Sequence, residues 1–224
     1  MSMPYYVSPE QMMQDKAEYA KKGISRGRST VAIEYDEGIL LLADNSSSLH
    51  KISEVYDRIG FAGAGKYSEF ENLRKAGIRH ADMKGYLYSR EDVAARSLAD
   101  AYSQTLGSIF SQENKPLEVE ILVVEVGDAT KKNEIYRIQF DGSIFDEKDF
   151  TVIGGKSEQL SEAIKSRYQK TDLKVVLKIC VEAMEEGYEQ TVDPNRLEAA
   201  VLDKNRKGRR FRRLTPKALA EYIA

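Results

Sequence analysis

Two hydroxyl residues, Ser29 and Thr30, are the side chains best placed for chemistry. They stand at the start of the first of two predicted strands, which flank a tight turn and end at Asp44, and a hydroxyl at a strand start is a candidate nucleophile. Such a hydroxyl reacts only when a free amine or a neighbouring base removes its proton. Neither histidine is predicted to act as that base, because His50 falls on a predicted strand and His80 at a polar helix end. No serine has the sequence pattern of a nucleophile elbow. No Ser-His-Asp triad is therefore predicted.

Other motifs that could bind a cofactor or metal are weak. "GAGK", from Gly63 to Lys66, lacks the spacing and the following Ser/Thr of a P-loop, so we interpret it as a turn from a strand to a helix. Two isolated histidines are too few for a metal site. The single cysteine, Cys180, lies in an apolar helical stretch and is interpreted as a buried thiol. We expect neither metal nor cofactor.

The charges nearly cancel, with 34 basic and 36 acidic residues. One basic run, "KNRKGRRFRR" from Lys204 to Arg213, is a candidate for binding a phosphate backbone. Its apolar flanks and Phe211 favour a solvated strand and turn, so we expect no nucleic-acid partner and keep nucleic-acid binding as an alternative. No apolar run approaches the ~20 residues of a membrane span. Without a signal-peptide pattern, we expect a cytoplasmic protein with no membrane partner.

The predicted elements come in an order that indicates fold class. A helix starts at Ser8-Pro9 and stops at Gly23, and strands, two helices, strands, two helices, strands and a final helix follow. Helices in consecutive pairs favour two stacked sheets covered by helical layers over a doubly wound sheet. We predict an α+β fold, a four-layer αββα sandwich with an extra N-terminal helix. It forms a single domain over 1–224: a mobile tail (1–7), the helix (8–23) and the sandwich (28–224).

The boundaries rest on caps, turns and periodicity. Ser89 is predicted to cap one helix, Ser157 and Thr171 to cap two others, and "DGS" at Asp141 to form a turn. The predicted strands cover 30–35, 39–44, 51–56, 58–64, 117–127, 133–140, 149–155 and 197–205, with a basic hairpin at 206–214, and the helices cover 67–81, 90–110, 158–169, 172–187 and the segment from Thr215.

Several of these stretches together resemble proteasome α-type subunits. They are "SPEQMMQDKAEYAKKGISRGRSTVAI", "GILLLADN", "HKISEVYDRIGFAGAG", "AYSQTLGSIF", "YRIQFDGSI" and "LEAAVLDKN…FRRLTPKAL", in family order over nearly the whole chain. The short tail and "PYYVSPEQ" are most similar to the actinobacterial α subunits. The resemblance implies an Ntn-hydrolase-like sandwich in a heptameric ring of identical copies. That ring stacks on a ring of proteolytic β subunits.

The resemblance also bears on Ser29 and Thr30. In the catalytic β relatives a threonine becomes the N-terminus and its own amine acts as base. The matching place here is near Arg28, but a capped helix precedes it, and no lysine stands around Ser48, where a supporting lysine is expected. We therefore predict a non-catalytic subunit, the alternative being an active Ntn hydrolase with an unprocessed N-terminus.

The resemblance further implies an activator site. A lysine at the "KI" position binds the C-terminal carboxylate of a ring-shaped ATPase or other activator, whose penultimate tyrosine packs nearby. That pattern falls on Lys51 in "LHKIS", with Glu18 and Gly27 as neighbours.

A gate is predicted at the N-terminus, through which protein substrates pass. The chain lacks the Tyr-Asp-Arg motif of archaeal and eukaryotic α subunits. Its bulky, uncharged start is predicted to plug a pore instead; the gate residues are Met1, Met3, Pro4, Tyr5, Tyr6, Val7, Ser8 and Pro9.

Overall fold

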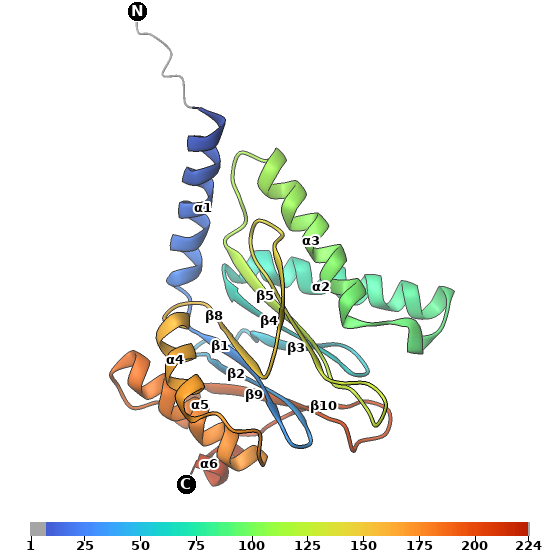
Figure 1. The fold of residues 1–224 in the computed structure, drawn as a ribbon, viewed down its shortest axis with the longest axis vertical. Helices are drawn as coiled ribbons and strands as arrows, with labels where there is room; N and C mark the ends of the chain where they lie inside the picture. Colours follow the sequence, from blue (N-terminus) through green and yellow to red (C-terminus); the bar gives the residue numbers. More distant parts are fainter. Residues whose placement is uncertain (1–7, 224) are drawn as a thin grey trace, which may run out of the picture.

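The computed structural model describes residues 8–223 of the chain (Figure 1). In chain order the elements are α1 (Pro9–Ser25), β1 (Thr30–Tyr35), β2 (Gly38–Asp44), β3 (Ile52–Tyr56), β4 (Ile59–Gly65), α2 (Tyr67–Leu87), the 3-10 turn η1 (Arg90–Asp92), α3 (Ala95–Gln112), β5 (Val119–Glu125), β6 (Glu134–Ile138), β7 (Ile144–Glu147), β8 (Phe150–Ile153), α4 (Ser157–Arg167), α5 (Leu173–Tyr188), the 3-10 turn η2 (Pro194–Arg196), β9 (Leu197–Asp203), β10 (Phe211–Arg213) and α6 (Pro216–Ile223).

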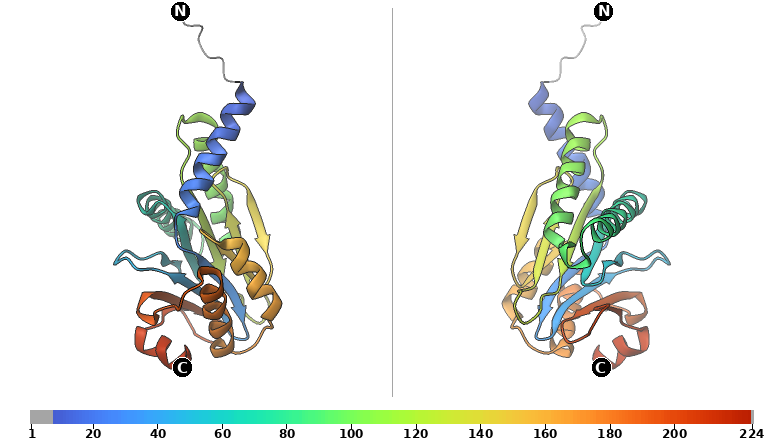
Figure 2. Two further views of the ribbon diagram at one scale, coloured as in Figure 1. Left: turned by 90° about the vertical axis from the view of Figure 1, so that its left-hand side faces the viewer. Right: turned by 90° about the vertical axis from the view of Figure 1, so that its right-hand side faces the viewer.

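Two five-stranded antiparallel sheets face each other, with strand orders β10-β9-β2-β1-β8 and β3-β4-β5-β6-β7. Small and branched side chains such as Ala32, Leu41, Ala62 and Leu122 fill the space between them. Helices α4, α5 and α6 cover the outer face of the first sheet, and α2 and α3 cover that of the second (Figure 2). This confirms the predicted αββα sandwich, which follows because each sheet has an apolar face to bury on either side.

Strand β2 is the centre of the first sheet. All seven of its residues are buried, as its unbroken apolar sequence predicts. It pairs with β1 on one side and with β9 on the other. A Cβ on Gly38 would come within 1.8 Å of the Leu202 carbonyl oxygen, so only glycine allows β9 to approach this closely.

Helix α1 stands outside the sandwich and packs against α3 and the loop after β6 (Figure 1). It runs two residues beyond the predicted stop at Gly23. Gly23 does not end the helix but lets it pack closely, because a Cβ there would lie 2.1 Å from Glu118 Oε2. Lys16 ties the helix to the end of α3 through hydrogen bonds to the carbonyl oxygens of Phe110 (3.1 Å) and Glu113 (2.7 Å).

The single helix predicted over residues 90–110 is wrong at its start. Ser89 caps only the short turn η1, and Val93 and Ala94 then adopt extended backbone before α3 begins. The Glu125 carboxylate, on β5 of the sheet beneath, accepts the Ala95 N–H at 2.7 Å. An acceptor from another element therefore sets the helix start, and no local signal in the sequence could indicate it.

Three further boundaries differ from the prediction. Asp172, not Thr171, caps α5 by accepting the Lys174 and Val175 N–H groups at 2.8 and 3.1 Å. Ser157 is the first residue of α4 and not its cap, since Lys156 precedes it in a left-handed conformation. The sequence also missed β7, which pairs with β6 across the predicted turn at Asp141.

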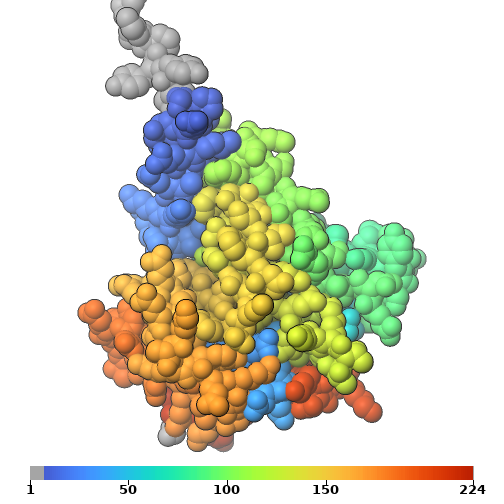
Figure 3. Space-filling view, in the orientation of Figure 1, coloured from blue at the N-terminus to red at the C-terminus, as the bar shows by residue number. Residues whose placement is uncertain are grey.

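The end of α2 presents an apolar surface, here called the α2 corner, that projects from the body of the molecule (Figure 3). Its members are exposed to between 59% and 86%: Met83, Tyr86, Leu87 and Tyr88. A cluster of exposed large apolar side chains is typical of a surface that another protein covers. None of the helices between residues 8 and 223 combines the length and apolar character needed to cross a bilayer.

We expect Glu125→Ala to lower the free energy of unfolding by about 2–3 kcal/mol, because it leaves a buried N–H and two cations without their acceptor. The Glu125 carboxylate is fully buried against Arg58 Nε and Lys131 Nζ, both at 3.0 Å. Urea denaturation measures the change. The matched control is Glu186→Ala, whose exposed pair with Arg167 is worth less than about 1 kcal/mol. Equal losses in the two variants would contradict this account of Glu125.

Candidate functional site

Both hydroxyls at the start of β1 are held inside the fold. Ser29 Oγ accepts a hydrogen bond from Tyr188 Oη at 2.7 Å and donates one to the Gly155 carbonyl oxygen. The Ser29 N–H donates to the same Tyr188 Oη at 2.8 Å. Thr30 is completely buried, and its Oγ1 has no hydrogen-bond partner between residues 8 and 223. Among residues 8–223, neither hydroxyl has a hydrogen bond to a base that could activate it.

The backbone before Ser29 is part of a built turn. The Gly27 N–H donates to the Ile24 carbonyl oxygen at the end of α1, and the Gly27 carbonyl accepts from the Gly155 N–H, both at 2.9 Å. Residues 28–30 are therefore internal peptide units that connect a packed helix to β1. A peptide nitrogen has no basic lone pair, so it cannot act as the amine base of an N-terminal nucleophile.

A lysine does lie at this strand start, which corrects the expectation drawn from the residues around Ser48. Lys51 Nζ donates to the carbonyl oxygens of Arg28 (3.0 Å) and Asp44 (3.1 Å). Asp44 is the last residue of β2 in the first sheet and Arg28 lies two residues before β1, whereas Lys51 immediately precedes β3 of the second sheet. Counting along the chain failed because the packing of one sheet on the other, not loop length, decides where this side chain reaches.

The ammonium of Lys51 is partly desolvated. Burial lowers its pKa to about 8, against the effect of Asp44 and Glu198, which raise it, while Arg28 lowers it further. The Asp44 carboxylate is itself paired with Arg28 Nη1 at 3.2 Å and with Arg196 Nη2 at 3.5 Å. An ammonium has three hydrogens, and two are used by the carbonyl oxygens. One hydrogen is left for an incoming acceptor.

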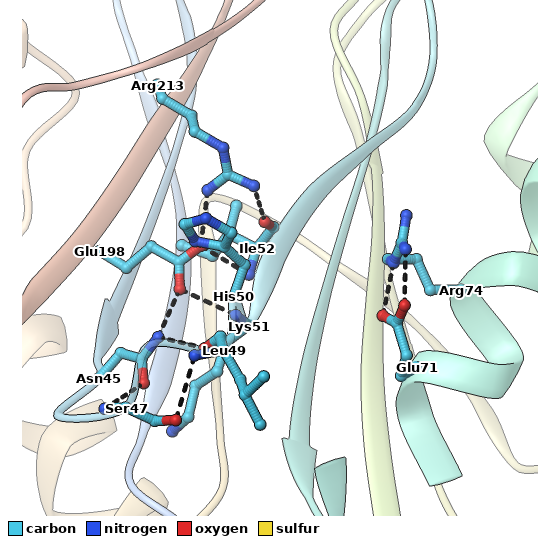
Figure 4. Close-up of polar contacts among 10 residues, drawn as sticks. All are labelled: Asn45, Ser47, Leu49, His50, Lys51, Ile52, Glu71, Arg74, Glu198 and Arg213. Carbon is cyan, nitrogen blue, oxygen red and sulfur yellow. Dashed lines mark hydrogen bonds and ion pairs between the residues drawn. The ribbon is translucent and has the colours of Figure 1, made fainter. Parts of the chain in front are cut away.

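Glu198, on β9, fixes the segment that carries Lys51 (Figure 4). Its Oε2 accepts the Lys51 N–H and Asn45 Nδ2, both at 2.8 Å. Its Oε1 accepts the Ile52 N–H at 3.2 Å and pairs with Arg213 Nη1 at 2.6 Å. Sequence analysis did not single out Glu198; the available signal was an acid near the start of an otherwise apolar strand, "LEAAVL".

The predicted neighbours of Lys51 divide into two groups. The Gly27–Arg28 turn lies next to it, because Lys51 Nζ bonds to the Arg28 carbonyl. Gly27 is also close to Gly65, because a Cβ added to Gly27 would lie 3.1 Å from the Gly65 nitrogen. Glu18 is exposed on α1 and has no hydrogen bond or ion pair with the described residues. Within one protomer the structure therefore unites Lys51 with Gly27 but not with Glu18.

Two of the predicted gate residues belong to the start of α1. Ser8 Oγ accepts the Gln11 N–H at 3.2 Å, and Pro9 is the first helical residue. The remaining gate residues lie outside the described residues: Met1, Met3, Pro4, Tyr5, Tyr6 and Val7.

The other candidates are the two histidines and the single cysteine. His50 Nδ1 lies 3.1 Å from Glu198 Oε1, His80 is exposed on α2, and no serine of the described chain bonds to either. Cys180 is completely buried, and burial raises the pKa of its thiol to about 12. The thiol therefore stays protonated and inert at neutral pH.

The "GAGK" segment forms the end of β4, and Lys66 alone connects that strand to α2. Gly65 has a φ of 101°, and a Cβ there would lie 2.0 Å from the Glu118 carbonyl oxygen. The Lys66 N–H donates to that same oxygen at 2.9 Å. Glycine is required by backbone packing at this turn.

Several cations of the basic run have partners within the fold. Arg209 pairs with Glu54 at 2.6 Å, and Arg210 Nη1 donates to the Gly127 carbonyl oxygen at 2.6 Å. Arg213 pairs with Glu198, and Phe211 is buried in the core between the sheets. These contacts support the solvated strand and turn over nucleic-acid binding.

Comparison with known proteins gives consistent matches. The model of the family described as "Proteasome subunit" matches residues 24–202. The chain is 52% identical to "Proteasome subunit alpha" of Thermobifida fusca, over the whole of this chain and 91% of the relative. It is 52% identical to the protein of that name from Rhodococcus jostii, over the whole chain and 90% of the relative. It is 51% identical to the protein of the same name from Xylanimonas cellulosilytica, over 98% of this chain and 95% of the relative.

We expect Thr30→Val to leave the stability of the protein unchanged or to raise it by up to about 1 kcal/mol, because the hydroxyl that it removes is buried without a partner. We also expect the purified chain to hydrolyse no fluorogenic peptide. Thermal unfolding measures the stability, and a peptidase assay measures the hydrolysis. Peptide turnover that disappears in Thr30→Val or Ser29→Ala would show instead that this strand start is catalytic.

Proposed function

We propose that this chain, which belongs to the proteasome subunit family, is a non-catalytic α-type subunit and that seven copies form the outer ring of a core proteasome. One observation carries the non-catalytic role: the strand start that would bear an N-terminal nucleophile is an internal peptide joined to the packed helix α1. In this proposal the proteolytic threonines lie on a partner β subunit. The α ring controls the access of protein substrates to them.

Assembly is supported by the apolar α2 corner. Its four side chains would be costly to leave in water, and burial in a subunit interface would remove that cost. The partners proposed here are other copies of this chain and the β subunit. The fully buried, protonated thiol of Cys180 suits the reducing cytoplasm, which we propose as the location of the particle.

The gate is proposed at the start of α1. This helix begins at Pro9, after the cap Ser8, and extends to one end of the molecule, beyond both sheets (Figure 1). Ser8, to which the residues Met1 to Val7 are joined in sequence, therefore lies at that end of the molecule. They carry no charged side chain and include two methionines and two tyrosines. Seven copies that meet on a ring axis would close a narrow pore by apolar contact.

The docking site for an activator is proposed at Lys51. An ammonium with one free hydrogen, in a partly desolvated position, is a good partner for a single carboxylate. The surrounding charges favour an anion, since Lys51 and three arginines outnumber the two carboxylates, Asp44 and Glu198, with which those arginines pair. The ligand proposed is the C-terminal carboxylate of a ring-shaped ATPase or other activator. Glu18 would join the site from a neighbouring copy.

Deletion of Ser2 to Val7 is expected to speed peptide hydrolysis by the assembled particle, because it removes the apolar plug. Fluorogenic peptide turnover measures the effect. A threonine-directed inhibitor should abolish the added activity, which shows that no new active site has formed. Unchanged turnover in a truncated particle that assembles normally would argue against the gate.

Lys51→Ala is expected to weaken activator binding by about 2–5 kcal/mol, the cost of removing one member of a desolvated carboxylate pair. Affinity measurements on intact α–β particles test this. The matched control is Lys75→Ala, which removes an exposed lysine of α2 that pairs with Glu71 at 3.5 Å. Particles of Lys51→Ala that bind the activator like the unmodified particle would refute the docking assignment.

The pH dependence of the same binding is a second measurement of that prediction. Because the pKa of Lys51 is lowered to about 8, the ammonium in the free site loses its proton as the pH rises through that value. Binding needs the charged form, so affinity should fall between about pH 7 and about pH 9. In Lys51→Ala this fall should disappear.

A further inference from the structure

The start of β3 lies at the edge of its sheet. β3 is the outermost strand in the order β3-β4-β5-β6-β7, and Ile52 faces Ala62 of β4 on its inner side. On the outer side the Ile52 N–H and C=O have no strand to pair with. Unpaired groups at a sheet edge must find other partners, because leaving them buried and unbonded is costly.

Two side chains from the other sheet supply the hydrogen-bond partners that a neighbouring strand would supply (Figure 4). Glu198 Oε1 accepts the Ile52 N–H at 3.2 Å, and Arg213 Nη2 donates to the Ile52 carbonyl oxygen at 2.5 Å. The two side chains come from the paired strands β9 and β10 and also bond to each other at 2.6 Å. They therefore offer Ile52 one acceptor and one donor, as a neighbouring strand would.

The same carboxylate holds the residue that carries the ammonium. Glu198 Oε2 accepts the Lys51 N–H and Asn45 Nδ2, both at 2.8 Å. The Glu198 side chain is 91% buried, since only 9% of it is exposed. Lys51 is thus fixed at both ends: its backbone by Glu198, and its Nζ by the carbonyl oxygens of Arg28 and Asp44.

We propose that the Glu198–Arg213 pair positions Lys51 to bind a free C-terminal carboxylate; the inference rests on the docking function proposed above. The pair acts through the backbone at Lys51 and Ile52 and does not touch the ligand. Without the carboxylate, two backbone N–H groups lose their acceptor, and the segment moves away from β9. The single free hydrogen of the ammonium then no longer points where the carboxylate arrives.

The test compares Glu198→Gln with Glu71→Gln in the assembled α–β particle. Glu71 is the matched control: its carboxylate also pairs with an arginine through two bonds of 2.7 Å, to Arg74, but it lies on α2 and contacts neither Lys51 nor Ile52 (Figure 4). Glutamine keeps the size of the side chain and removes the charge. It also places N–H groups against the donors that the carboxylate accepted.

Two readouts separate positioning from docking. Hydrogen exchange at the Lys51 and Ile52 amides reports whether the segment is still held. Binding of a six-residue peptide that ends in Tyr-Ala with a free carboxylate, against the same peptide with an amidated end, reports carboxylate capture. We expect Glu198→Gln to speed exchange at both amides and to weaken binding of the free-carboxylate peptide by about tenfold or more, as loss of an orienting partner does at metal ligands. Glu71→Gln should change neither.

The failures of the two proposals differ. If Lys51→Ala abolishes binding of the free-carboxylate peptide but Glu198→Gln binds it normally, the positioning role is overturned while docking stands. If Lys51→Ala binds it normally, docking at Lys51 is refuted, and the positioning role for it falls as well. Should Glu198→Gln fail to assemble, Arg213→Gln decides, because it removes the donor to the Ile52 carbonyl from a side chain that is 38% exposed. Weaker binding in that variant supports the proposal, and unchanged binding overturns it.

Discussion

The close approach of the two sheets is the constraint on which the rest of the structure depends. Their facing sides carry small residues where the strands are nearest, and a Cβ on Gly60 would come within 3.0–3.1 Å of side chains from Leu41, Val124 and Leu202. Because interiors are packed to crystal density, this contact leaves little freedom in how one sheet sits on the other. Residues from separate parts of the chain therefore meet at its margin, and the lysine site is one such meeting.

The start of β1 carries two hydroxyl side chains that are both held inside the fold. The Ser29 hydroxyl is hydrogen-bonded to Tyr188 and Gly155, and Thr30 is completely buried in the core. Lys51 is held beside this strand start, and burial lowers its pKa. A group suited to support a nucleophile is therefore present, although no activated nucleophile lies next to it. A partly desolvated ammonium that supports no reaction is free to bind a ligand, which is the role that we propose for it.

A buried carboxylate is stabilised only when its oxygens are saturated with donors. Glu198 meets this condition with donors from the loop after β2, the start of β3 and β10. The cost of burying its charge is offset by closing a sheet edge that would otherwise be open to pairing with another chain. Arg213 also bonds to this sheet edge, through the Ile52 carbonyl oxygen, and pairs with Glu198. Part of the basic run that suggested a nucleic-acid surface therefore neutralises an acid inside the fold.

Local patterns determined much of this protein. Paired helices predicted the αββα layers, the unbroken apolar run of β2 predicted its central place, and capping residues near Ser8 and Thr215 placed the terminal helices within a few residues. These features depend on neighbours in the chain, so the sequence carries them. Tertiary structure alone decided the start of α3, which depends on Glu125, and the surroundings of Lys51, which depend on Arg28 and Glu198. Those contacts join residues between 23 and 147 positions apart, and only the packing of the two sheets and their helices brings such residues within hydrogen-bond distance.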